Sequence, residues 1–128
     1  TLLSYLHYLD EINLTRNLFK FGEGINPLHK PSKIYLENTN LIYLLARGNA
    51  NRGNLRESFF ANQVGFKHQL NFTDIGGFKV DDSYTFEIGE KNKTNKQIKT
   101  AAESFVVSDD ITHGFHHKIP LWLFGFLY

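Results

Sequence analysis

The stretch from Gly76 to Lys93 constrains the fold most, because apolar and polar residues alternate in it on both sides of a short polar turn. A period of two is typical of strands with one buried face. A three-residue loop after Val80 would set Val80 opposite Tyr84 and gather the apolar side chains of both arms on one face. A two-residue loop would set Phe78 against Glu87 instead. We therefore predict a hairpin in the first register.

That register also fixes the polar face of the predicted hairpin. It places Gly77 opposite Glu87 and Lys79 diagonal to Glu87. Glu87 is then a carboxylate on the solvent side of the hairpin, just before a predicted basic helix. A cross-strand ion pair with Lys79 is the ordinary explanation for such a carboxylate. The functional explanation for the Glu87 carboxylate is that it belongs to a metal site, either a remnant or an active one.

Composition limits the classes of function. The chain has 128 residues, enough for one domain, and a net charge of +1, so any basic patch has to be local. It has no cysteine, which excludes disulfides and thiolate metal sites and fits a reducing, cytoplasmic location. The longest apolar run, residues 119–128, is too short to cross a membrane. Because methionine is also absent, we expect the chain to be a fragment of a longer protein.

Apolar spacing and turn residues predict the other elements. We expect helices over residues 2–14, 40–47, 54–70 and 94–105, the last two opening with the capping boxes Asn54-x-x-Glu57 and Thr94-x-x-Gln97. Strands are expected over 14–21, 33–36 and 105–108, an exposed loop over 22–32, a loop over 113–117 and an apolar terminal element over 119–128. This order predicts an α/β fold, with the best internal boundary at residues 48–53.

Five segments, in this order, resemble one family: SYLHYL (4–9), KIYL (33–36), LRESFF (55–60), YTFEIG (84–89) and IPLW (119–122). The family is the C-terminal region of bacterial and archaeal AAA-type ATPases, a domain of unknown function that follows a nucleotide-binding module and a winged helix. The resemblance implies a partial winged-helix segment over residues 1–47. Over residues 48–128 it implies a small mixed sheet flanked by helices, similar to the restriction-endonuclease or PD-(D/E)XK nuclease fold. It also implies an upstream ATPase module as partner, since this chain lacks a Gly-Lys-Ser/Thr phosphate loop.

In that nuclease fold, a helix glutamate, a strand aspartate and a Glu-x-Lys pair hold Mg²⁺ and position the nucleophile. The resemblance assigns the two glutamate positions to Glu57 and Glu87. The aspartate position falls on Gly77 and the lysine position on Gly89, so we expect a degraded site without tight Mg²⁺ binding. Nearby substitutes for the lysine are Lys79, Lys91 and Lys93. The ordinary explanation for Glu57 is its place in the helix cap.

Our leading functional hypothesis is a non-catalytic module that recognises a nucleic acid or protein partner and signals to the ATPase. Its nucleic-acid contacts would come from four lysines around the start of the predicted basic helix: Lys91, Lys93, Lys96 and Lys99. The first alternative is a metal-dependent nuclease with a rearranged site that uses Glu57 and Glu87, with Mg²⁺ as its cofactor. The second is a structural module whose apolar terminal element docks on the ATPase or on a second copy. We predict no resident metal, and we expect His113, His116 and His117 to be exposed loop residues.

Overall fold

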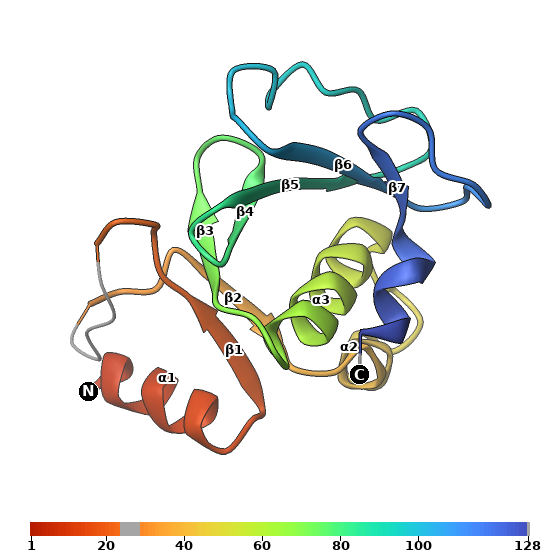
Figure 1. Ribbon diagram of the computed structural model, residues 1–128. Coiled ribbons are helices and arrows are strands. Elements are labelled where there is room, and N and C mark those ends of the chain that lie inside the picture. The colour runs from red at the N-terminus through yellow and green to blue at the C-terminus, as the bar shows by residue number, and fades with distance from the viewer. Residues whose placement is uncertain (24–28, 128) are drawn as a thin grey trace.

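The larger of two sheets organises the protein. The computed structural model describes residues 1–23 and 29–127. Its five-stranded sheet has the order β3-β4-β5-β6-β7 (Figure 1). Neighbouring strands are antiparallel from β3 to β5 and parallel from β5 to β7. The strands are β3 (Leu70–Thr73), β4 (Gly77–Val80), β5 (Tyr84–Gly89), β6 (Ser104–Ser108) and β7 (Lys118–Pro120). This mixed sheet with flanking helices confirms the predicted α/β class.

The predicted hairpin register is confirmed. Val80 pairs with Tyr84 and Phe78 pairs with Phe86 across β4 and β5. Asp81 and Asp82 in the connecting turn both have positive φ, of 49° and 56°. Aspartate tolerates this left-handed conformation better than most residues, so the three-residue loop forms at moderate cost.

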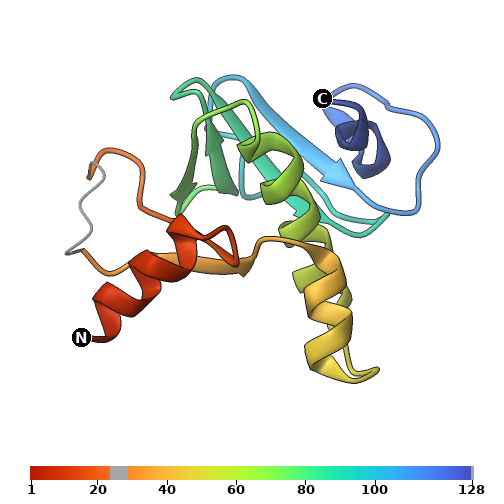
Figure 2. The same cartoon turned by 90° about the horizontal axis from the view of Figure 1, so that it is seen from below.

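A two-stranded ribbon precedes the larger sheet. β1 (Thr15–Leu18) and β2 (Lys33–Leu36) pair antiparallel, and α1 (Leu2–Glu11) packs on β1. Beyond β1 the chain follows the outer side of β3, where Lys20 forms a bridge with Phe72. Figure 2 shows α2 (Thr39–Ala46) leaving β2 to lie beside the start of α3. Residues 24–28 of the predicted loop and Tyr128 lie outside the described residues, and the division at residue 48 stays a prediction.

Two helices, α3 (Arg52–Gly65) and the 3-10 helix η1 (Leu121–Phe126), lie on one face of the sheet (Figure 1). Aromatic side chains fill the core between this face and the two helices. Phe60 of α3 has no exposed surface and lies at its centre. Its ring centroid is 5.0 Å from that of Phe78, 5.3 Å from Phe86 and 5.0 Å from Phe124, all in tilted or edge-on geometry. Such geometry is the favoured one for aromatic pairs. This cluster therefore connects the hairpin, α3 and η1.

The opposite face of the sheet is covered by residues 90–103, which Figure 1 shows on the side away from α3. The predicted helix over residues 94–105 is wrong: residues 95–103 form turns and bends, and β6 begins at Ser104. Ile98 is the single buried residue of this segment, at 1 % exposure, and lies against Gly76, where a Cβ would come within 2.5 Å of its Cγ2. A side chain at residue 76 would therefore displace this anchor. One buried anchor, rather than an apolar helix face, holds the segment in place.

The helix predicted over residues 54–70 is shifted and shortened. Asn51 caps α3, because its side chain accepts a hydrogen bond from the Asn54 N–H, and the helix ends at Gly65. The chain then turns, because the Asp81 carboxylate accepts a hydrogen bond from the Gln69 N–H and lies 2.6 Å from Nδ1 of His68. Leu70 consequently begins a strand, β3, which the helical spacing of apolar residues did not reveal.

Candidate functional site

A polar hollow of about 220 Å³ lies where α3, β2 and the hairpin meet. Both carboxylates predicted as site residues, Glu57 and Glu87, line it. The other polar side chains in its wall include Lys33, Asp74, Lys93 and Gln97. The structure thus brings together two residues that stand 30 positions apart in the sequence. It adds a lysine and an amide from the irregular segment over the sheet.

Glu87 is buried rather than solvent-facing, which corrects the sequence prediction. Only 3 % of its surface is exposed, because residues 90–103 cover its face of β5. Its Oε1 lies 2.7 Å from Nζ of Lys93. This contact is an ion pair by distance, but its angles are not those of a hydrogen bond, and neither carboxylate oxygen has a hydrogen-bond donor among the described residues. A buried carboxylate with unused acceptor capacity is costly unless something supplies donors or positive charge.

Lys93 occupies the space that a side chain at residue 89 would fill. A Cβ on Gly89 would lie 2.6 Å from Cγ of Lys93 and 2.7 Å from its Cβ and Cδ. Three lysines were considered as replacements for the lysine of the nuclease fold, and of these it is Lys93 that lies over Gly89. The predicted pairing of Lys79 with Glu87 is wrong, since Lys79 Nζ lies 3.3 Å from Oγ1 of Thr85 instead.

Glu57 is not part of the cap of α3, which also corrects the prediction. Its Oε2 accepts a hydrogen bond from the Tyr35 hydroxyl at 2.7 Å. Tyr35 belongs to β2 and is 9 % exposed. Burial raises the pKa of Tyr35 well above its ordinary value, and the bond to Glu57 raises it further, so the hydroxyl remains a donor at neutral pH. This contact orients Glu57 toward the hollow and connects the ribbon to α3.

The hollow lacks the ligands that a tight magnesium site needs. Continuing the hairpin register by one residue sets Gly77 opposite Glu87, where the nuclease fold has its aspartate. The nearest substitute, Asp74, is exposed and forms an ion pair with Lys20 at 2.7 Å. Among residues 1–23 and 29–127, no group of three acidic, histidine or cysteine side chains is placed to hold a metal ion. The residues present therefore do not fit Mg²⁺, which requires near-octahedral oxygen ligands.

Two further hollows continue from the first along residues 93–103. The second, of about 250 Å³, shares Lys93 with the first and adds Lys118, His116 and His117. The third, of about 260 Å³, shares His117 and Asn95 with the second and adds Lys99. The predicted lysine set is thus split. Lys93 and Lys99 line this row, Lys91 and Lys96 are exposed outside it, and Lys118, which was not predicted, belongs to it.

No protein family, curated protein or solved structure matches this chain. Within the described part of the chain, no helix combines the length and apolarity needed to span a bilayer.

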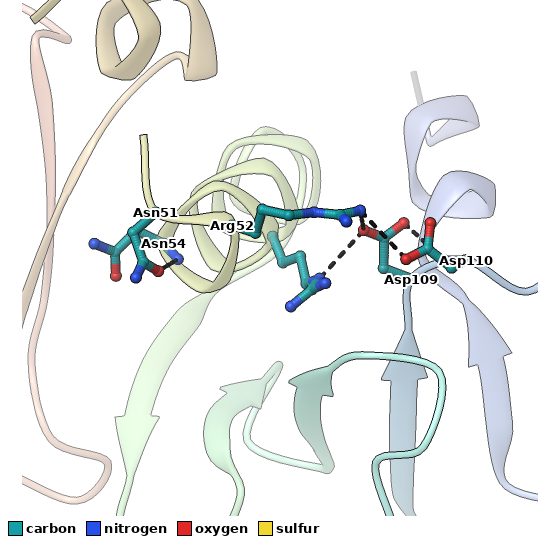
Figure 3. Close-up of polar contacts among 6 residues, drawn as sticks. Asn51, Arg52, Asn54, Asp109 and Asp110 are labelled. Carbon is teal, nitrogen blue, oxygen red and sulfur yellow. Dashed lines mark hydrogen bonds and ion pairs between the residues drawn. The ribbon is translucent and has the colours of Figure 1, made fainter. Parts of the chain in front are cut away.

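A larger hollow, of about 520 Å³, lies elsewhere, between α2, α3 and η1. Beside it, Arg52 at the start of α3 reaches toward Asp109 and Asp110 after β6 (Figure 3), and Arg56 pairs with Asp109 as well. Nε of Arg56 and an Nη of Arg52 lie 3.2 Å and 3.4 Å from Oδ2 of Asp109, and Arg52 also pairs with Asp110 at 3.2 Å. Burial alone would raise the pKa of Asp109, but the Asp110 N–H and Arg56 outweigh it, so this pKa is lowered. Two arginines facing two carboxylates neutralise each other, so this cluster anchors α3 rather than attracting an ion.

Proposed function

We propose that this protein is a non-catalytic nucleic-acid-binding module, which binds the phosphate backbone along the row of hollows beside residues 93–103. The observation that carries the proposal is the sharing of lining residues between consecutive hollows, with a lysine in each. Lys93, Lys118 and Lys99 follow one another along this row. A linear series of cations in a concave surface is complementary to a linear polyanion.

The net charge of +1 makes the local arrangement decisive. A nearly neutral protein has little general attraction for polyanions, so binding depends on where its cations stand. Lys93 already pairs with Glu87, while its side chain remains one-third exposed. The resemblance to the C-terminal region of AAA-type ATPases would give such a module a role in passing a binding signal to an ATPase.

The proposal is tested by the salt dependence of nucleic-acid binding. Fluorescence polarisation with a labelled oligonucleotide should give an affinity that falls as salt rises. The variant Lys99→Ala/Lys118→Ala should bind more weakly and reduce the slope of log K against log salt by about 1.5. A matched variant, Lys30→Ala/Lys67→Ala, removes two exposed lysines outside the row and should bind like the wild type. Equal effects of the two variants, or no binding at all, would refute the proposal.

A second candidate function is cleavage of nucleic acid, and the position of Lys93 favours it. Its stem lies over Gly89, where the nuclease fold has its lysine, and its ammonium contacts Glu87. Against it stands the absence of a fitting set of metal ligands among the described residues. Incubation with single- and double-stranded DNA and RNA in Mg²⁺ or Mn²⁺ separates the two candidates. Cleavage that Glu87→Gln abolishes would replace the binding proposal by a nuclease.

A further inference from the structure

A tight turn at residues 115–118 projects an aromatic side chain beside the second hollow. The Phe115 N–H donates to the Lys118 carbonyl at 3.0 Å, and the Lys118 N–H donates back to the Phe115 carbonyl at 2.9 Å. His116 at the tip has a φ of 52°, a strained conformation for a residue with a side chain. The direction in which the turn projects is thus fixed by two backbone hydrogen bonds and by the left-handed backbone conformation of His116.

Phe115 is the most exposed large apolar residue among those described, at 73 %. The centroids of the Phe115 and His116 rings are 4.0 Å apart and the rings meet edge-on at an interplanar angle of 70°, so the His116 ring supports the Phe115 ring from one side. The support leaves much of the Phe115 ring accessible. Single exposed apolar residues are common on protein surfaces, so exposure alone assigns no role. The lysines near the Phe115 ring are the second reason to assign it a role in binding.

Lysines line the hollows beside the turn, and one of them, Lys93, is paired with Glu87. Lys93 and Lys118 line the same hollow as Phe115, and Lys99 lines the next one. Glu103 is the one acidic residue among the lining residues of these two hollows. An accessible aromatic ring interleaved with lysines is the arrangement that binds single-stranded nucleic acids, in which bases stack on rings while cations follow the backbone. In a duplex the bases already stack on each other, so their faces are not available to Phe115.

We propose that the Phe115–Lys118 turn stacks against an unpaired base, which makes single-stranded nucleic acid the preferred ligand of the adjoining row of hollows. This inference rests on the proposed nucleic-acid binding and narrows its ligand class. The lysines contribute to binding of either form, whereas Phe115 contributes to the single strand alone. Strand preference and overall affinity therefore depend on different side chains, and can be tested separately.

The experiment compares one labelled DNA of about 12 nucleotides, within the usual footprint of such sites, as a single strand and as a duplex with its complement. Polarisation titrations use the full chain as wild type, as Phe115→Ala and as Phe126→Ala. Phe126 is a matched control, since it is 65 % exposed on η1 and lines neither hollow. Circular dichroism verifies that each variant is folded.

We expect the wild type to prefer the single strand, and Phe115→Ala to weaken single-strand binding about tenfold, in the range that loss of one stacked base produces. Duplex binding by Phe115→Ala and both affinities of Phe126→Ala should stay at the wild-type values. Equal binding of both DNA forms, or an unchanged single-strand affinity of Phe115→Ala, would overturn this inference and leave the lysine row as the binding surface. Absence of binding to either form would overturn the proposed function as well.

Discussion

Replacing Lys93 by methionine should destabilise the protein through the charge it leaves behind on Glu87. Methionine keeps an unbranched stem over Gly89, so the packing in the space above residue 89 is largely retained. The change removes the ammonium that lies 2.7 Å from the Glu87 carboxylate. Because Glu87 is 3 % exposed, water cannot easily replace this partner.

The expected magnitude follows from the burial of the two partners. Removing one member of a fully buried ion pair costs about 3 to 5 kcal/mol. The side chain of Lys93 is 33 % exposed and its contact with Glu87 is poorly aligned for a hydrogen bond, so solvent already weakens the pair. We therefore expect a loss of about 1 to 3 kcal/mol in the free energy of unfolding. For a chain of this length, such a loss corresponds to a fall in Tm of roughly 4 to 11 °C.

Urea unfolding of four proteins measures this effect and assigns its cause. These are the wild type, Lys93→Met, Glu87→Gln and the double variant. Glutamine removes the buried charge at nearly constant shape, so the double variant should recover to within about 1 kcal/mol of the wild type. A Lys93→Met protein as stable as the wild type would show that the Lys93 ammonium does not stabilise the buried Glu87 carboxylate. So would a double variant whose loss is the sum of the two single losses.

Three further predictions concern the core, the hollow and the anchor of α3. Phe60→Ala should cost about 3 to 5 kcal/mol in urea unfolding, because it empties the centre of the aromatic cluster; a loss below 1 kcal/mol would contradict that placement. Tyr35→Phe should cost about 1.5 to 3 kcal/mol, because it removes the only hydroxyl that donates to Glu57 among the described residues, and Glu57→Gln should restore part of this loss. The lowered pKa of Asp109 adds stability above its unfolded value of 3.8, and this stability disappears as the pH falls through the folded-state pKa. Unfolding measured between pH 6 and about pH 2 should consequently show a weaker acid dependence for Asp109→Asn than for the wild type.

The hairpin could be predicted from the sequence because its information is local. Alternating residues fix which side chains share a face, and a slip by one residue would have turned Phe78 toward the polar side. The observed pairing of Phe78 with Phe86 agrees with this argument. The alternation also places Glu87 on the other face from Phe86, but it does not show that this face is covered.

The covering segment was beyond sequence reasoning because its position depends on distant contacts. The residues around Ile98 have helical spacing, yet the turn bonds from the Ile98 N–H to Asn95 and from the Ala101 N–H to Ile98 span three residues each. Packing of Ile98 against Gly76 decides this course, and no local pattern shows it. The position of Lys93 over Gly89 is likewise a packing contact that no local sequence pattern shows. One signal was available: a glycine at residue 89 leaves room for a side chain from elsewhere.

The course of residues 19–21 has a consequence for self-association. The Phe21 N–H donates to the Phe72 carbonyl at 2.7 Å, and the Phe72 N–H donates to the Phe19 carbonyl at 2.9 Å, so the outer rim of β3 already has backbone partners. At the opposite rim, β7 has three residues and ends at Pro120, which has no N–H to donate. Exposed strand edges are where sheets of separate molecules join into aggregates. The edge of β3 is already occupied, and the edge of β7 is short and ends in a proline. This sheet therefore offers little exposed edge to which another molecule could add a strand.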